Sequence, residues 1–209
     1  MPRAVRERQM LDAAVATFAQ RGYRAASMDE IAELAGVSKP LVYLYLNSKE
    51  ELFGACVRRE AQALVEAVRS AVEPECGSAS RQLWNGLRGF FAHTADHPDG
   101  WAVLNSQART HGEPFADEVA AMREQLVAYV RRLIAAAGCE ARCAPEPVSE
   151  REIAGLAHAL VGAAESLAGW ANAVPGERPS AQETATVAMN FAWAGLQNLM
   201  DGNRWSPAP

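Results

Sequence analysis

The sequence predicts an all-helical protein, and three observations support this fold class. Apolar residues recur at spacings of three and four, alanine is abundant, and no long stretch alternates β-branched with polar residues. Clusters of Gly, Pro and Ser interrupt this pattern and divide the chain into nine predicted helices. Their approximate ranges are 4–20, 28–34, 39–45, 49–73, 81–95, 101–110, 115–137, 150–173 and 181–200.

The composition indicates a folded chain without a membrane span. Of the 209 residues, 49% are hydrophobic, which is enough to bury a substantial core. No apolar run approaches the roughly 20 residues that a membrane helix needs. The start, MPRAVRERQML, lacks the apolar segment of a signal peptide. Four scattered cysteines fit a reducing compartment better than a disulfide framework, so we expect a cytoplasmic protein.

Four of the predicted helix starts carry the capping-box pattern S-x-x-E. In this arrangement the Ser oxygen accepts a hydrogen bond from a free backbone N–H, while the Glu side chain accepts one from the N–H of the Ser. Each pair lies at a break that Gly, Pro or Ser residues indicate independently, which supports these boundaries. The pairs are Ser27/Glu30, Ser48/Glu51, Ser149/Glu152 and Ser180/Glu183.

The first three predicted helices form a helix-turn-helix unit. The second and third have only about seven residues each, and helices that short do not persist alone in water. Gly36 and Ser38 provide the turn between them, with Ser38 capping the third helix. We expect apolar side chains to hold the short helices on the first one: Leu11, Ala14, Val15 and Phe18 on that helix, and Ile31, Leu34, Val42 and Leu46 opposite them.

The third helix presents a face that can read DNA. At 100° per residue, Val42 and Leu46 point together toward the small core. A helix of this length spans about 10 Å and fits the major groove. Residues 1–49 carry seven Lys or Arg against five Asp or Glu, whereas residues 50–209 carry 13 against 20, so only this end favours an anionic partner. The outward residues are Lys39, Pro40, Leu41, Tyr43, Leu44 and Tyr45.

The stretch GYRAASMDEIAELAGVSKPLVYLYLNSKEELF closely resembles the DNA-binding region of TetR-family transcriptional regulators. The resemblance covers about residues 5–55, and the later helix count agrees with the family's ligand-binding domain. It implies a DNA-binding domain at 1–50 and a ligand-binding and dimerisation domain at 51–209. It also implies a homodimeric, ligand-responsive repressor of a palindromic operator, in which a bound small molecule changes the spacing of the two reading helices through the fourth helix. The residues it assigns to DNA are Ser27, Lys39, Pro40, Leu41, Tyr43, Leu44, Tyr45 and Lys49.

Two positions of the reading helix depart from the family pattern. Leu41 stands where the family often has Thr, and Leu44 where it often has His or Trp. Because leucine cannot hydrogen-bond to base edges, we expect apolar contacts with thymine methyl groups and more weight on Lys39 and Tyr45. The alternative is that both leucines pack beneath the fourth helix.

The last two predicted helices, 150–173 and 181–200, favour dimerisation. Each carries a seam of small residues, and such seams let helix backbones approach closely. We expect an isologous four-helix contact between two copies, whereas the alternative is that the seams only pack the pair within one chain. The seams are Gly155, Ala159, Gly162, Ser166, Gly169 and Ala173 in the first helix, and Ala181, Ala185, Ala188, Ala192 and Gly195 in the second.

The helices between these regions supply candidates for an effector cavity. Aromatic and apolar side chains with a few polar groups are what a small-molecule site needs, although each aromatic residue also fits the core. Glu165 has no charged neighbour in its surroundings, ALVGAAESLAGW, so it needs a hydrogen-bonding partner, a ligand or solvent. The candidates are Trp84, Phe91, Trp101, Met122, Tyr129, Glu165 and Trp170.

Two other classes of function compete with the regulator. The stretch FAHTADHPDGWAV brings together His93, Asp96, His97 and Asp99, with His111 and Glu113 further on, as an enzyme or metal site would. It lacks the Glu beside the first His that H-E-x-x-H zinc sites have, so we expect neither catalysis, nor a metal, nor a cofactor. A dimeric helical adaptor that reads no DNA is the other alternative.

Overall fold

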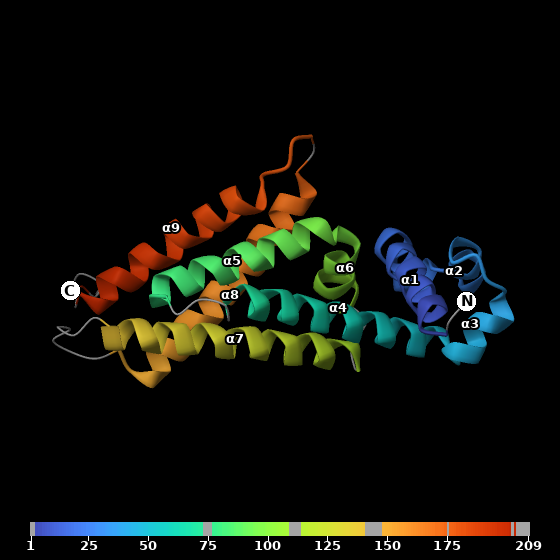
Figure 1. Ribbon diagram of the computed structural model, residues 1–209, viewed down its shortest axis with the longest axis horizontal. Helices are drawn as coiled ribbons and strands as arrows, with labels where there is room; N and C mark the ends of the chain where they lie inside the picture. The colour runs from blue at the N-terminus through green and yellow to red at the C-terminus, as the bar shows by residue number, and fades with distance from the viewer. Residues whose placement is uncertain are drawn as a thin grey trace. The chain divides into compact units, whose positions relative to one another are not determined.

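A computed structural model describes residues 3–72, 77–108, 114–140, 148–174, 176–201 and 203, and every regular element in these ranges is a helix (Figure 1). The all-helical prediction is confirmed, and most boundaries lie within a few residues of the predicted ones. None of the described helices is long and apolar enough to cross a membrane. The elements are α1 (Arg3–Ala25), α2 (Met28–Leu34), α3 (Lys39–Tyr45), α4 (Lys49–Val72), α5 (Ala79–Asp96), α6 (Pro98–Ala102), η1 (Val103–Ala108), α7 (Phe115–Glu140), α8 (Glu150–Ala173) and α9 (Ala181–Met200).

The chain divides into two compact units. The first unit comprises Met1–Ala63 and His97–Met122, and the second comprises Leu64–Asp96 and Arg123–Pro209. Helices α4 and α7 therefore each contribute residues to both units. The domain boundary predicted near residue 50 falls inside the first unit, and that boundary stays a prediction.

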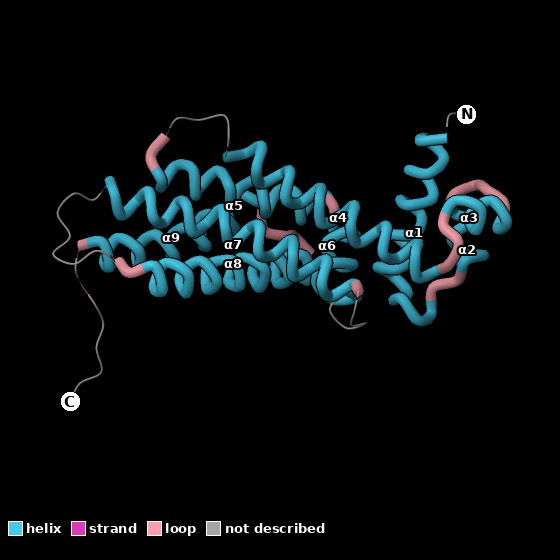
Figure 2. The backbone as a smooth tube through the Cα atoms, turned by 90° about the horizontal axis from the view of Figure 1, so that it is seen from below, coloured by secondary structure: helices cyan, strands magenta, loops and turns pink. Residues whose placement is uncertain are grey.

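In the first unit, α2 packs against α1, and α3 packs against α2 (Figure 2). Phe18, Ile31 and Val42 are fully buried where these helices meet, as the apolar spacing predicts. The prediction for Leu34 is wrong, because its side chain is 61% exposed. In a helix of seven residues only one narrow face can be covered, and Met28, Ile31 and Ala32 occupy it.

Two departures from the predicted helices concern the same place in the first unit. Helix α1 extends beyond the predicted end near residue 20, but Gly22 breaks it with a left-handed φ of +76°. The predicted helix at 101–110 is instead the short α6 followed by the π-helix η1. The Gln107 side chain of η1 accepts a hydrogen bond from the backbone N–H of Tyr23 at 3.2 Å, which fastens η1 to the chain beside the Gly22 break.

The predicted capping boxes form fully at two starts. Ser149 and Ser180 each accept a hydrogen bond from the backbone three residues on and donate through their own N–H to the Glu at that position. At Ser48 only half of the box forms, because the Glu51 side chain accepts a hydrogen bond from Asn47 at 2.9 Å instead.

The caps at the two short helices differ from the prediction. The Ser27 side chain accepts from the N–H of Asp29, and Glu30 turns away to pair with Arg21 at 3.1 Å. Ser38 begins α3 but makes no capping hydrogen bond through its side chain. Helix α3 therefore depends on Val42 and on its neighbours more than on a cap.

In the second unit, α5 lies alongside α9, and α8 packs against both (Figure 1). Ala185 and Ala188 of α9 are buried within the chain. The backbones of α4 and α5 come close at Gly89, where an added Cβ would lie 2.7 Å from the Cβ of Ala71. These contacts hold α4, α5, α8 and α9 together in the second unit.

Candidate DNA-binding face, effector cavity and dimer face

The outer side of α3 is open to solvent. Lys39, Pro40, Tyr43 and Leu44 are exposed, while Leu41 is half-buried. Leu44 is 75% exposed, so in this structure it does not pack beneath α4. The fully buried Val42 anchors the opposite side of the helix. A short helix that is buried on one side and exposed on the other has the geometry of a recognition helix.

Lys39 and Lys49 are held in defined positions near this face. The ammonium group of Lys39 lies 2.9 Å from the Asp29 carboxylate, and that hydrogen bond raises the Lys39 pKa. Lys49 donates to the backbone oxygen of Arg24 at 3.1 Å and lies 5.0 Å above the ring of Tyr23. Desolvation lowers the Lys49 pKa. Contacts within the chain therefore hold both ammonium groups in position without a bound partner.

Two further predicted residues have local partners. Tyr45 is half-buried, and the Arg3 guanidinium lies 5.1 Å from the centre of its ring. The Ser27 oxygen accepts from the N–H of Asp29 at 3.1 Å, so its hydroxyl hydrogen remains available to an acceptor. These contacts are compatible with the predicted role in DNA binding, which stays a prediction for each residue.

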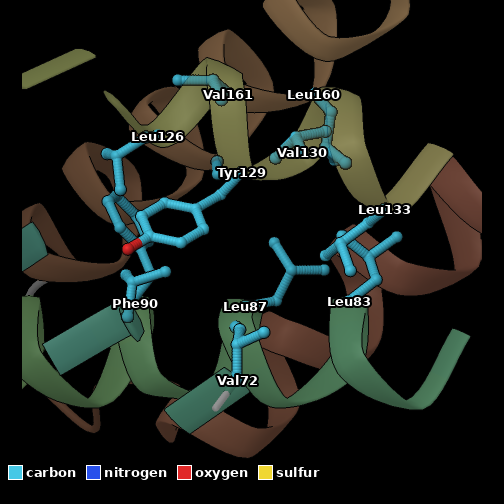
Figure 3. Close-up of a pocket in the computed structure, with 13 residues that line it drawn as sticks. Val72, Leu83, Leu87, Phe90, Leu126, Tyr129, Val130, Leu133, Leu160 and Val161 are labelled. Atoms are coloured by element: carbon cyan, nitrogen blue, oxygen red, sulfur yellow. The ribbon is translucent and has the colours of Figure 1, made fainter. Parts of the chain in front are cut away.

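The second unit contains an apolar cavity of about 50 Å³ (Figure 3). Figure 3 shows the ring of Tyr129 projecting among aliphatic side chains, with Leu83 and Leu87 across the space from Leu160 and Val161. Tyr129 is the one lining residue with a polar side chain. The lining residues are Val68, Val72, Leu83, Gly86, Leu87, Phe90, Leu126, Tyr129, Val130, Leu133, Leu160, Val161 and Ala164.

Of the seven residues predicted to bind an effector, only Tyr129 lines this cavity. Phe91 lies beside a smaller cavity of about 40 Å³ between α5, α8 and α9. Trp101 and Met122 are buried in the first unit, and Trp84 is half-buried on α5. The lining of this cavity therefore overlaps the predicted set only at Tyr129, because those residues were selected for aromatic or polar character and the cavity wall is mainly aliphatic. The effector role of the seven residues stays a prediction.

Glu165 is buried and satisfied by a partner within the chain. The Arg123 guanidinium lies 3.3 Å from its carboxylate and also donates to the backbone oxygen of His158 at 3.4 Å. Such a pair answers the requirement for a partner without any ligand. Glu165 thus ties α8 to α7.

Sequence reasoning missed the aliphatic wall for a physical reason. Leu83, Leu87 and Phe90 follow one another at helical spacing on α5, as core residues do. Spacing identifies a buried face but not whether the neighbouring helix fills the space opposite. The sequence therefore carries no signal that separates this wall from ordinary core.

In the described part of the chain, α8 and α9 expose three large apolar side chains. Trp170 is 54% exposed, Val187 is 53% exposed and Phe191 is 72% exposed. An added Cβ at Gly155 or at Gly195 would meet no atom within 4 Å. The small seam of α8 is thus largely open, whereas Ala185 and Ala188 in the α9 seam pack inside the chain, as the alternative expected.

The histidine stretch forms no metal site in the part of the chain that the structure describes. No group of three or more His, Cys, Asp or Glu residues in these ranges could hold an ion. Asp96 and His97 are exposed at the end of α5. His111 and Glu113 lie outside the described residues.

Comparisons with known proteins agree with this arrangement. Residues 10–56 match the family described as bacterial regulatory proteins, tetR family, and residues 79–195 match the tetracyclin repressor-like C-terminal domain. The chain is 34% identical to the HTH-type transcriptional activator FasR of Mycolicibacterium smegmatis, over 95% of this chain and 86% of that protein.

Solved structures share the fold. A TetR-like transcriptional regulator from Rhodococcus sp. RHA1 is 38% identical, with a TM-score of 0.78 over 94% of this chain and 98% of that one. A transcriptional regulator from Pseudomonas aeruginosa PAO1 has a TM-score of 0.80 over 98% of this chain and 96% of its own, at 16% identity. The second likeness concerns the fold alone.

Proposed function

The chain belongs to the TetR family of DNA-binding transcriptional regulators, and from this membership we propose a homodimer that binds a palindromic operator under the control of a small-molecule effector. The observation that carries the proposal is the exposed outer side of α3, held by the buried Val42.

DNA binding is proposed to use α3 in the major groove. Lys39, Tyr43 and Lys49 contact phosphates, which fix the position of the helix on the duplex. Leu44, free of the core, and Leu41 contact thymine methyl groups. Ser27, Pro40 and Tyr45 complete the surface. Helix starts with free N–H groups add attraction for phosphate at the same side.

Dimerisation is proposed through α8 and α9. Trp170, Val187 and Phe191 give these helices an exposed apolar face, and such faces favour association. An isologous contact makes the assembly two-fold symmetric, as a palindromic operator is. Two copies of α3 can then read half-sites about one helical turn of DNA apart.

The effector is proposed to bind in the apolar cavity of the second unit. At about 50 Å³ the cavity is too small for most effectors, so binding has to expand it. Its walls include the parts of α4 and α7 that belong to the second unit, and both helices continue into the unit that bears α3. An effector that prefers one dimer geometry thereby shifts operator affinity.

Two structural neighbours support an effector with a hydrocarbon part. AibR has been solved with isovaleryl coenzyme A and operator DNA, and FadR from Bacillus subtilis with stearoyl-CoA. Their identities of 20% and 15% limit the likeness to the fold. A cavity lined by Leu, Val and Phe side chains suits a hydrocarbon chain on the same physical grounds.

Repression relieved by the effector is the proposed sign of regulation, and activation is the second candidate. The family resemblance favours repression, while the relative from Mycolicibacterium smegmatis is named an activator. Run-off transcription from the bound promoter separates the two. Fewer transcripts on adding the protein support repression, and more transcripts support activation.

A footprint on the DNA around the protein's own gene tests the proposal. We expect a protected palindrome, and the Tyr43→Ala variant should bind it about tenfold more weakly because a hydrogen bond to a charged phosphate is lost. The Glu33→Gln variant, changed on the exposed part of α2, serves as the control. Absence of binding by the wild-type protein at low salt would overturn the regulator.

A further inference from the structure

Tyr129 lines two spaces of different character in the second unit, an apolar cavity and an open groove with charged and apolar residues in its lining. On one side it lines the apolar cavity. On the other it lines an open groove of about 520 Å³, together with Arg131, Arg132 and Glu150. Tyr129 is the residue that the two linings have in common.

The charge of the groove comes from Arg132. The neighbouring Arg131 is paired with the Glu150 carboxylate at 3.3 Å. The Arg132 guanidinium lies 4.6 Å from the centre of the Tyr129 ring. Within the described residues no carboxylate pairs with Arg132, so its charge is balanced only by the ring, which is a weak partner at an exposed site.

The two spaces favour different parts of a ligand. An anionic group cannot enter the aliphatic cavity, because an unpaired charge is strongly disfavoured in apolar surroundings. A hydrocarbon chain gains little from an open, hydrated groove, but it gains from burial among leucine and valine side chains. A molecule that fills both spaces must have one apolar part and one anionic part.

We propose that the effector is an amphiphile, in which a single hydrocarbon chain enters the cavity past Tyr129 and an anionic head group binds Arg132 in the groove. The inference rests on the proposed function only in taking this cavity as the effector site. The head group forms charge-assisted hydrogen bonds with the guanidinium, which leaves the Tyr129 ring. The ring is then free to turn and admit the chain.

Tyr129 and Arg132 thus close the cavity together. Without ligand, the cation over the ring holds the ring across the cavity. With ligand, the anion draws Arg132 away, and the chain occupies the space the ring has left and widens it. Ligands with a chain alone or an anion alone lack one of these two steps and bind more weakly.

The head group can come from two sources, a free carboxylate or a phosphate such as that of an acyl-coenzyme A. The carboxylate of a fatty acid ends the hydrocarbon chain directly, whereas the pantetheine arm of an acyl-coenzyme A separates its phosphates from the chain; both anions suit a guanidinium. Dodecanoate, dodecyl phosphate and dodecanoyl-coenzyme A therefore serve as anionic probes of equal chain length. 1-Dodecanol is the uncharged probe, and octanoate tests the chain.

Titration calorimetry with the full chain, below the micelle concentration of each probe, tests the inference. We expect the best anionic probe to bind at least about tenfold more tightly than dodecanol, since hydrogen bonds to a charged group are lost in the alcohol. Octanoate should bind more weakly than dodecanoate by up to about fourfold for each methylene removed. If dodecanoate binds most tightly, the head group is a carboxylate. If either phosphate probe binds most tightly, the head group is a phosphate.

Variants separate the two arginines. In Arg132→Gln the affinity for the anionic probes should fall to that for dodecanol, while dodecanol binding is retained and shows that the cavity is intact. In Arg131→Gln, where the removed charge was already paired with Glu150, the change should stay within about threefold.

Two results would overturn the inference: equal binding of dodecanol and the anions by the wild-type protein, or unchanged discrimination in Arg132→Gln. A gel shift with operator DNA on the same samples distinguishes this failure from failure of the proposed function. Operator binding without amphiphile binding removes only the present inference. If the wild-type protein does not bind operator DNA, the proposed function as a regulator fails.

Discussion

The ammonium nitrogen of Lys39, on the recognition helix α3, lies 2.9 Å from a carboxylate oxygen of Asp29 on α2. Both side chains are substantially exposed, at 45% for Lys39 and 69% for Asp29. The pair connects the two short helices of the helix-turn-helix on the side that α3 presents to solvent. A phosphate that approaches Lys39 therefore competes with a carboxylate already in place.

Replacement of Asp29 by Asn should strengthen operator binding. The substitution removes a negative charge beside the DNA and frees the Lys39 ammonium for a phosphate. The gain in affinity should stay within about fivefold, because the Lys39–Asp29 pair is exposed. The dependence of affinity on salt should steepen by up to about one ion. Gel shifts at several salt concentrations measure both quantities.

Two further variants control this experiment. Glu33→Gln removes an exposed charge of α2 that pairs with no lysine in the described chain, so it should change affinity less. Lys39→Ala should weaken binding and flatten the salt dependence by about one ion. Equal affinity of Asp29→Asn and wild type at low salt would show that Lys39 contacts no phosphate.

The close approach of α4 and α5 makes Gly89 necessary for stability. An added Cβ would lie 2.7 Å from the Cβ of Ala71 and 3.2 Å from the backbone oxygen of Ala67. Gly89→Ala should lower the free energy of unfolding by about 1–3 kcal/mol, because the helices have to move apart. Chemical denaturation followed by circular dichroism measures the change.

Gly138→Ala is the matched control for this prediction. Gly138 also lies within a helix, but an added Cβ there meets no atom within 4 Å. The alanine should raise stability by up to about 1 kcal/mol through helix propensity alone. A Gly89→Ala protein as stable as the wild type would mean that α4 and α5 are not in such close contact.

How much of this structure the sequence predicts depends on how local each feature is. The starts of α8 and α9 could be predicted because Ser149 and Ser180 carry their own capping signals. The burial of Val42 follows from helical spacing, whereas the exposure of Leu34 does not, because spacing alone cannot tell how wide a face the neighbour covers.

The π-helix η1 and the apolar cavity could not be predicted from such local signals. Gln107 accepts from the Tyr23 backbone 84 residues earlier in the chain, a contact that no short pattern announces. The cavity wall repeats the spacing of an ordinary core, and Glu165 finds its partner Arg123 on another helix. The spacing along α3 was enough to predict a face for DNA, but the lining of the cavity depends on how four helices pack.

Burial should make Cys56 unreactive in the folded protein. Its side chain is fully buried, and desolvation raises the pKa of the thiol to about 12 from an ordinary value near 9. The reactive thiolate is therefore scarce at pH 8, and reagent cannot reach the sulfur. Labelling with a thiol reagent at that pH should modify equal numbers of cysteines in the wild type and in Cys56→Ala.

The raised pKa of the Cys56 thiol also makes the free energy of unfolding depend on pH. The contribution of the protonated thiol to stability is fully present below the unfolded-state pKa near 9, and it is lost as the pH rises from there toward about 12.

The labelling experiment has its own control. Under denaturing conditions the wild type should show one more reactive cysteine than Cys56→Ala. An extra labelled site in the native wild type would contradict the burial.

The exposed apolar face of α8 and α9 predicts which residue dimerisation depends on. Phe191 is 72% exposed in the single chain, and covering it in a dimer removes a large apolar side chain from water. Phe191→Asp places a charge in that contact, where it has no partner. Sedimentation at micromolar concentration should show a monomer for the variant and a dimer for the wild type.

Operator affinity should fall by at least about tenfold in Phe191→Asp, because each monomer reads only one half-site. Gln182→Asp introduces the same charge at an exposed position near the start of α9 and serves as the control, with sedimentation and affinity close to those of the wild type. Dimeric Phe191→Asp would mean that this apolar face is not the contact between copies. Monomeric Phe191→Asp with unchanged operator affinity would mean instead that one half-site is sufficient, and that the coupling of effector to DNA does not pass through the dimer.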